Sequence, residues 1–339
     1  MSHPTESADT RTDITTVTQH ILEQQRAHKG STGDLSLLLT AIASACKWVS
    51  NVVRKAELLK VVGVAGTTNV QAEQQQKLDV LSNEIMINLL RGSGRTCLLV
   101  SEEDEDALFV SGDERGSYCV CFDPLDGSSN IDCGVAVGTI FGIYAVKDIA
   151  NPTLKDVLRP GSEMIAAGYC MYGSSTVLVY TTQGCPVNGY TLDPNLGEFL
   201  LTHRNIQIGH KNIYSINEGN CATFDKAITT YLHDIRYPPK EGAPAGWKPY
   251  TARYVGSMVA DMHRTLLYGG IFLYPGAKLR ILYECFPMAF LVEHAGGAAT
   301  DGRTRMLDIV PSQIHARSRI YLGTKAEVER IEQLYAELM

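Results

Sequence analysis

The chain has 339 residues, of which 45% are apolar and 20% are charged, so it can build a sizeable core and is not disordered over any large part. Its 30 Lys and Arg against 37 Asp and Glu give a net charge of −7, which argues against a protein that coats nucleic acid. The length favours two domains, and no continuous apolar run approaches the roughly 18 residues of a membrane span.

The N-terminal residues 1–18 are polar and lack the patterns of a secretory signal and of a transit peptide. The nine cysteines include no C-x-x-C pair, and strand alternation would place Cys119 and Cys121 on one face. Buried free thiols are therefore expected, which is typical of a reducing compartment. The last three residues do not match the peroxisomal Ser-Lys-Leu signal, so the expected location is the cytoplasm.

Helical periodicity dominates the first hundred residues. Helices are predicted from about Asp13 to His28, from Asp34 as an N-cap, and from about Lys77 to Arg91. Between Val61 and Gln76 the periodicity disappears, and a loop of this length in a compact protein is more often functional than idle. The second helix carries one apolar stripe: Leu35, Leu38, Leu39, Ile42, Ala43, Cys46 and Val49.

From Thr96 the apolar residues alternate with period two, and after His210 strands alternate with helices. We expect a helix-plus-sheet domain over residues 1–205 and an alternating α/β domain over residues 206–339. A final helix is predicted to open with a capping box from Thr324 to Glu327. The expected strands are Cys97–Ser101, Tyr118–Phe122, Val135–Val146, Met164–Met171, Thr176–Thr182, Glu198–Thr202, Ile213–Ile216 and Ile271–Tyr274, and the remaining helices are Phe224–Asp234, Ser257–Leu267 and Tyr283–His294.

Two acidic segments follow predicted strands. Ser101–Asp106 contains five successive carboxylates, which alone are most often a solvated turn, although strand ends are where open α/β sheets place ligands. Phe122–Asn130 reads Phe-Asp-Pro-Leu-Asp-Gly-Ser-Ser-Asn, which alone could be a turn that uses Pro and Gly for their backbone angles.

A functional interpretation of the second segment uses more of its residues. If Asp123 leaves a strand end and Asp126 returns to the same point, the two carboxylates and the Leu125 carbonyl offer oxygen ligands suited to Mg²⁺ or Mn²⁺. Gly127–Ser129 would offer N–H and hydroxyl donors beside them, as an anion cradle. A cation site that touches such a cradle suits metal-assisted phosphoryl chemistry.

Two further segments, Arg253–Met258 and Tyr274–Arg280, combine cations with tyrosine. Each alone is more often surface charge, but such residues can bind a sugar phosphate. Glu284 opens an apolar helix, where a carboxylate ordinarily suits the helix dipole. The sequence contains no P-loop, dinucleotide fingerprint, G-x-S-x-G or H-E-x-x-H motif.

Together these segments resemble the class 1 fructose-1,6-bisphosphatase family over nearly the whole chain. The D-P-x-D-G core alone indicates only the wider superfamily of Mg-dependent sugar and inositol phosphatases. The narrower match rests on blocks in the same order: Lys77–Asn83, Gly138–Tyr144, Ala252–Asp261, Tyr268–Pro275 and Leu282–Cys285. The resemblance implies a layered α/β/α/β/α fold, a homotetramer, and hydrolysis of the 1-phosphate of fructose 1,6-bisphosphate with two or three Mg²⁺ or Mn²⁺ ions.

The resemblance also implies roles for individual residues. Asp79 and Glu73 would belong to a catalytic loop, with Glu73 standing where the family commonly has Asp, and Asp79 and Glu103 would deprotonate and align the attacking water. The implied metal ligands are Glu73, Glu102, Glu103, Asp123, the Leu125 carbonyl, Asp126 and Glu284. The implied substrate residues are Asp126, Gly127, Ser128, Ser129, Asn217, Tyr254, Gly256, Ser257, Met258, Tyr274, Lys278 and Arg280, with Arg253 reaching into a neighbouring subunit's site.

Several positions depart from the family pattern. Asn220 replaces a Tyr, and the loop before Lys278 is shortened, which affects the 6-phosphate pocket. Members are commonly inhibited by AMP where the first two helices meet, and the matching residues here are Thr32, Gly33, Asp34, Ser36 and Tyr118. Because Ser117 and Ala145 replace a Lys and an Arg, we expect weaker AMP binding, with Arg26 and Lys29 as candidate replacements.

Two alternatives remain open from the sequence. One is a sedoheptulose-1,7-bisphosphate or inositol phosphatase on the same scaffold. The segments that combine tyrosine with cations favour a ketose bisphosphate as the substrate. The other is a non-catalytic metal or nucleotide sensor, against which the retained acidic residues argue.

Overall fold

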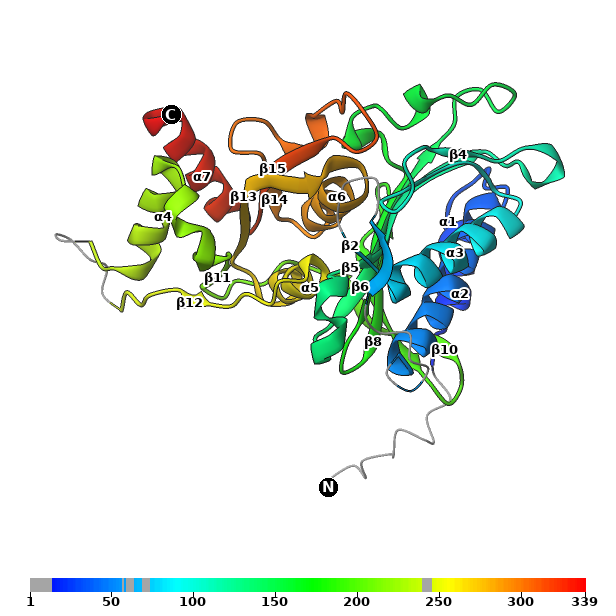
Figure 1. The fold of residues 1–339 in the computed structure, drawn as a ribbon, viewed down its shortest axis with the longest axis horizontal. Coiled ribbons are helices and arrows are strands. Elements are labelled where there is room, and N and C mark those ends of the chain that lie inside the picture. Colours follow the sequence, from blue (N-terminus) through cyan, green and yellow to red (C-terminus); the bar gives the residue numbers. More distant parts are fainter. Residues whose placement is uncertain (1–13, 57, 59–63, 69–73, 240–245) are drawn as a thin grey trace.

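The computed structural model describes residues 14–56, 58, 64–68, 74–239 and 246–339, and it is built in five layers (Figure 1). Three helices cover the outer face of a large sheet, two lie between that sheet and a smaller one, and two cover the outer face of the smaller sheet. The α/β/α/β/α fold expected from the sequence is therefore confirmed. The helices are, in this order of layers, α1 (Val17–Ala27), α2 (Asp34–Arg54) and α3 (Lys77–Gly92); α5 (Met258–Tyr268) and α6 (Phe286–His294); and α4 (Lys226–Arg236) and α7 (Lys325–Leu338).

The large sheet has eight strands in the order β10-β9-β8-β7-β6-β5-β3-β4. Neighbouring strands are antiparallel except for β3 and β5, which are parallel and leave their carboxyl ends side by side. This pair carries the two acidic segments at one edge of the sheet. The strands are β3 (Thr96–Ser101), β4 (Leu108–Phe109), β5 (Tyr118–Asp126), β6 (Val137–Ala145), β7 (Ala166–Tyr172), β8 (Thr176–Thr182), β9 (Val187–Asp193) and β10 (Glu198–Ile206).

The small sheet has five strands in the order β12-β11-β13-β15-β14. β11 is parallel to β12 and to β13, whereas β15 is antiparallel to β13 and to β14. The strands are β11 (Ile213–Ser215), β12 (Thr251–Ala252), β13 (Ile271–Arg280), β14 (Ala298–Thr300) and β15 (Arg317–Gly323).

Helix α6 explains how the two sheets are joined. All residues of Phe286–Val292 are buried, because the helix contacts β6 and β7 of the large sheet and β14 and β15 of the small one. A helix that is apolar on every side needs such an enclosed position. It is preceded by a π-helical turn, Ile281–Cys285, that is buried throughout and carries Glu284.

Several local predictions need correction. The segment expected to be a loop contains a hairpin of β1 (Val64–Thr68) and β2 (Gln74–Gln76). Asp34 is the first residue of α2, and the N-cap is Gly33 with a left-handed φ of 90°. No capping box forms at α7, because the Thr324 hydroxyl accepts from the Gly270 N–H and the Glu327 carboxylate accepts from two tyrosine hydroxyls.

The cysteines follow the prediction in part. Cys119 and Cys121 are buried in the same core cluster, between the two sheets. All nine cysteines are free, six of them buried, while Cys133 and Cys221 are exposed and Cys185 is half-buried.

Helix α2 is long and apolar enough to cross a membrane by length and composition, with a mean hydropathy of 1.4. Half of this apolar stretch of α2 is buried inside the fold, where Leu38, Ile42 and Val49 pack on the large sheet. A core helix meets the same criteria, and we assign α2 to the core.

Candidate active site

A cavity of about 530 Å³ gathers residues from both halves of the chain. Its walls come from the carboxyl ends of β3 and β5, the first turns of α3 and α5, strand β13 and the π-helical turn. Its lining includes every described residue that the sequence analysis assigned to metal binding or substrate binding, except Arg253. The lining is Asp79, Glu102, Glu103, Asp123, Leu125, Asp126, Gly127, Ser128, Ser129, Asn217, Tyr254, Gly256, Ser257, Met258, Asp261, Phe272, Tyr274, Lys278, Leu279, Arg280 and Glu284.

A bulge in β5 places two carboxylates on the same side of the sheet. Residues three apart on a regular strand face opposite sides, yet the pairing of Asp123 with Ile140 and of Asp126 with Gly138 leaves one extra residue on β5. Consequently Leu125 joins the core under α1–α3, and Asp126 faces the cavity with Asp123. The sequence predicted that Asp123 leaves the strand end and that Asp126 returns to the same point; in the structure both belong to β5, and the bulge brings them to one side.

Glu284 completes the carboxylate cluster. Ligand atoms of Asp123, Asp126 and Glu284 all lie within 4.8 Å of one another, and all three residues are buried. The π-helical turn presents Glu284 and lets the Arg280 backbone N–H donate to its Oε2 at 2.7 Å. Three buried carboxylates in this space are a donor set that fits a hard divalent cation.

The electrostatics of the cluster also indicate a cation site. Burial, and next the neighbouring carboxylates Glu102, Asp126 and Glu284, raise the pKa of Asp123 well above its usual range. Burial chiefly raises the pKa of Glu284, and it raises the pKa of Asp126 to about 6 against the hydrogen bonds that Asp126 accepts. Buried like charges are costly unless cations neutralise them.

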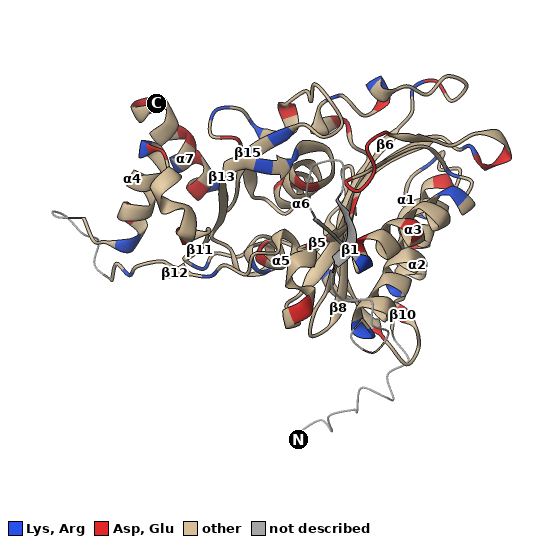
Figure 2. Ribbon diagram, in the orientation of Figure 1, with Lys and Arg blue, Asp and Glu red and all other residues tan. Residues whose placement is uncertain are grey.

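Arg280 supplies part of that neutralisation from the protein. Its guanidinium lies 2.8 Å from Glu102 and 3.7 Å from Glu284, and the side chain is buried. Arg280 was assigned to substrate from the sequence, and the structure places it among the carboxylates. Figure 2 shows both signs of charge interspersed over most of the ribbon, with a run of acidic residues on the loop after β3.

The Gly127–Ser129 cradle lies directly against the start of α5. Gly127 has a left-handed φ of 77°, and a Cβ placed there would lie 2.7 Å from the Ser257 Cβ. The Ser257 hydroxyl and the Val259 N–H donate to Asp126 Oδ2 at 3.1 and 2.8 Å. Ser257 therefore packs against Gly127 and also hydrogen-bonds to Asp126, which connects the start of α5 to both segments.

The residues predicted around the sugar and 6-phosphate line the same cavity, except for Arg253. Asn217 caps the short helix that contains Asn220, where the family pattern has Tyr. Arg253 does not line the cavity of its own chain, and its guanidinium donates to the Ala252 carbonyl at 2.8 Å. Glu73 lies outside the described residues. Sequence reasoning missed Asp261, which is in the cavity wall, although the resemblance included the segment that ends with it.

A second cavity, of about 250 Å³, lies where α1 and α2 meet the large sheet. Of the residues matched to the AMP pattern, Thr32, Gly33, Ser36 and Tyr118 line it. Asp34 does not, and its carboxylate instead lies 2.9 Å from the Arg95 guanidinium.

The candidate replacement cations also lie outside this second cavity. Arg26 lines a separate hollow with Glu23, so it is not placed to replace the missing cations. Among the described residues, neither Lys nor Arg lines the α1–α2 cavity, and His28 is its basic residue.

The fold and the site define a class of protein: a phosphatase whose cavity is lined by buried carboxylates able to hold divalent cations. Comparison with known proteins narrows the class. Residues 15–204 match the model "Fructose-1-6-bisphosphatase, N-terminal domain", and residues 208–336 match its C-terminal counterpart. The chain belongs to the fructose-1,6-bisphosphatase family.

Individual relatives agree over nearly the full length. The chain is 57% identical to a cytosolic fructose-1,6-bisphosphatase of Saccharum hybrid and 58% identical to that of Solanum tuberosum, covering 96% of both chains in each case. A crystal structure of Leishmania major fructose-1,6-bisphosphatase in holo form is 40% identical, with a TM-score of 0.87 over 95% of this chain and 99% of that one.

Proposed function

We propose that this protein hydrolyses the 1-phosphate of fructose 1,6-bisphosphate to give fructose 6-phosphate and phosphate, as a gluconeogenic enzyme of the cytoplasm. The observation that carries this proposal is that one cavity is lined both by a carboxylate cluster and by neutral or cationic phosphate-binding side chains. The cluster of Asp123, Asp126 and Glu284 repels a phosphate unless divalent cations are present. The same lining includes Asn217, Tyr254, Tyr274 and Lys278, which can bind a second phosphate directly.

This combination favours a ketose bisphosphate over inositol monophosphate, which has no second phosphate for Lys278 to bind. The relatives' names support the same substrate over sedoheptulose bisphosphate and over a non-catalytic sensor. The test is phosphate release from fructose 1,6-bisphosphate with and without Mg²⁺, using inositol 1-phosphate as the control. Equal turnover of both compounds, or none of the bisphosphate, would contradict the proposal.

The proposed cofactor is Mg²⁺ or Mn²⁺, two or three per site, held by Asp123, Asp126, Glu284, Glu102 and Glu103, with the Leu125 carbonyl and Glu73 as further ligands. Divalent cations supply charge neutralisation of phosphoryl oxygens and make water more acidic. In this proposal Gly127–Ser129 bind the 1-phosphate through N–H and hydroxyl donors. Asp126 is held rigidly for its role by the two hydrogen bonds from the start of α5.

Asp79 and Glu103 are the proposed bases that orient the attacking water and accept its proton. Asp79 is buried in the first turn of α3, directly after the β1–β2 hairpin, and both acids line the main cavity. The proposed catalytic loop is the segment that includes this hairpin, with Glu73 as its second carboxylate.

Replacing Asp79 by Asn should lower kcat by about 10²–10⁴-fold, the usual range for a general base, while KM changes by less than about threefold. The reason is that this carboxylate acts on the water and not on the bound sugar. Steady-state kinetics with saturating Mg²⁺ measures both constants. A rise in KM alone would instead make the segment a substrate-binding element.

Two features of organisation complete the proposal. Residues 1–205 would form a regulatory domain that shares the metal site, and residues 206–339 a domain that binds the fructose bisphosphate. The protein would be a homotetramer in which Arg253 completes the cavity of a neighbouring subunit, in keeping with its position outside its own cavity.

We also propose that the cavity between α1 and α2 binds AMP as an allosteric inhibitor, more weakly than in members with both cations. Thr32, Ser36 and Tyr118 offer hydroxyls to a phosphate there, but the described lining contains neither Lys nor Arg. Losing two charge-assisted hydrogen bonds of roughly 1.5–3 kcal/mol each weakens binding by about two to four orders of magnitude.

An AMP titration checks this proposal. We expect Arg26→Ala with Lys29→Ala to shift the inhibition constant by less than about twofold, since Arg26 lines another hollow. His28→Ala should weaken inhibition, because His28 lines the cavity. Tight inhibition by AMP that is indifferent to His28 would place the phosphate elsewhere.

A further inference from the structure

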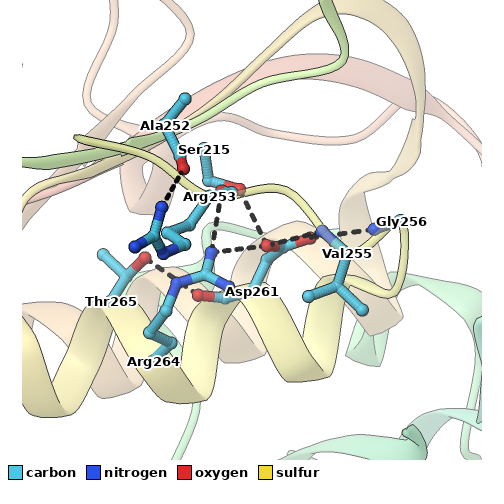
Figure 3. Close-up of polar contacts among 8 residues, drawn as sticks. All are labelled: Ser215, Ala252, Arg253, Val255, Gly256, Asp261, Arg264 and Thr265. Atoms are coloured by element: carbon cyan, nitrogen blue, oxygen red, sulfur yellow. Dashed lines mark hydrogen bonds and ion pairs between the residues drawn. The ribbon is translucent and has the colours of Figure 1, made fainter. Parts of the chain in front are cut away.

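Asp261 is the one charged residue of the cavity wall that the sequence did not single out. It lies in the first turn of α5, and its exposed fraction is 0%. Figure 3 shows its carboxylate surrounded by donors from the preceding segment, from β11 and from the next turn of the helix. A carboxylate this deeply buried persists only if its oxygens are hydrogen-bonded and its charge is paired.

The donors fall into two groups. Oδ1 accepts from the Ser215 hydroxyl at 2.8 Å and from the Arg264 guanidinium at 2.5 Å. The backbone N–H groups of Val255 and Gly256 donate to Oδ2 at 3.0 and 3.1 Å, and the Val255 N–H also lies 3.1 Å from Oδ1. The Ser215 hydroxyl and Arg264 hold the carboxylate in place. The carboxylate in turn fixes the backbone of Val255 and Gly256.

Arg264 forms a second contact with the segment that precedes α5. Its Nη2 donates to the Arg253 carbonyl at 3.0 Å as well as to Asp261. The Asp261–Arg264 pair therefore fixes the backbone before and after Tyr254, which is exposed and has no regular secondary structure to support it. Gly256 adopts a left-handed φ of 87° at the end of this segment.

We propose that Asp261 is the positioning residue of the 6-phosphate subsite: it shapes the Arg253–Gly256 segment so that Tyr254 and the adjoining backbone meet the phosphate. This inference rests on the proposed function, because it names the part of the substrate that the segment receives. Asp261 acts through the segment and takes no part in the chemistry. Asp126 stays anchored by Ser257 and Val259 at the start of α5, so the metal end depends on Asp261 less.

Asp261→Asn tests the proposal with almost no change in size. Asn has one acceptor oxygen, so its NH₂ group must face either the two backbone N–H groups or the Ser215 hydroxyl and Arg264, and the segment must shift. We expect the affinity for fructose 6-phosphate, measured by calorimetry, to fall at least about tenfold. KM for fructose 1,6-bisphosphate should rise by a similar factor, with kcat within about threefold of wild type.

Fructose 1-phosphate separates positioning from a general structural role. It has no 6-phosphate, so its kcat/KM should change by less than about threefold in Asp261→Asn. Asp308→Asn is the matched control, because Asp308 also pairs with an arginine three residues away, Arg305 at 2.7 Å, but lies outside the main cavity. That variant should match wild type in every measurement.

A second variant keeps the proposal testable if Asp261→Asn does not fold. Arg264→Lys retains the charge but loses the guanidinium that reaches both Asp261 and the Arg253 carbonyl, and it should weaken fructose 6-phosphate binding by about three- to tenfold. Wild-type affinity in whichever variants fold would overturn the proposal, as would equal losses on both fructose phosphates. Failure of the proposed function would look different, since wild type itself would then not release phosphate from the bisphosphate.

Discussion

Asp126→Asn should lower kcat for fructose 1,6-bisphosphate by about 10³-fold at saturating Mg²⁺. The Asn side-chain oxygen can still accept from Ser257 and Val259, so the fold is retained, while the cluster of Asp123, Asp126 and Glu284 loses one negative charge. Charge stabilisation by a metal site amounts to several kcal/mol, and each 1.4 kcal/mol or so corresponds to a factor of ten in rate.

The same variant should be more stable than wild type when metal is removed. The pKa of Asp126 is raised from 3.8 to about 6 by burial, and at about 1.4 kcal/mol per pKa unit its ionised form costs the metal-free fold roughly 3 kcal/mol at pH 7. Thermal unfolding in EDTA measures this gain.

Asp156→Asn is the control, because Asp156 is also buried and accepts from the Thr153 N–H, yet lies outside the main cavity. Its kcat should equal that of wild type. Activity near wild type in Asp126→Asn would remove Asp126 from the metal site.

The affinity for Mg²⁺ should fall by at least about tenfold between pH 6 and pH 5. The raised pKa values of Asp123, Asp126 and Glu284 mean that the metal-free fold holds protons on this cluster, and binding a cation expels them. For each proton expelled, the affinity for Mg²⁺ falls by a factor of about ten per pH unit below the pKa of that group.

The stability of the metal-free protein changes with pH in the opposite direction to its affinity for Mg²⁺. Asp126 contributes stability that is complete below pH 3.8, its ordinary pKa, and is lost as the pH rises through about 6. The increase in melting temperature on adding Mg²⁺ should therefore grow from pH 5 to pH 7. Calorimetry in buffers of different ionisation enthalpy would count the protons released, and a release of none at pH 5.5 would contradict the raised pKa values.

Much of the fold could be predicted from the sequence wherever apolar residues recur at the spacing of a helix or of a strand over a whole element. The apolar stripe from Leu35 to Val49 lies within α2, and the strand expected over Thr176–Thr182 is β8. The prediction missed β9, because Asn188 and Gly189 interrupt its pattern, and missed β15, because Arg317 and Arg319 begin a strand that is buried only in its second half.

The site was predictable to the level of residue type and segment, and the resemblance supplied the rest. What the sequence could not give were contacts between distant residues. Nothing in the segment of Arg280, for example, revealed that Glu102 lies beside it. Asp261 was passed over because its function depends on Val255, Gly256 and Ser215, which only the tertiary structure brings to it.

The bulge in β5 makes the number of residues in this segment as important as their identity. Cys119 and Cys121 face the space between the sheets, whereas Val120 and Phe122 face α1–α3. Removing either Pro124 or Leu125 would restore regular alternation, and the two aspartates, then two residues apart, would still face the same side, but the extra backbone unit that the bulge adds between them would be lost. Leu125 is in the core under α1–α3 and also lines the cavity, so the bulge brings its backbone to the two carboxylates. A homologue one residue shorter here should therefore keep both aspartates on the cavity side and lose the backbone oxygen between them.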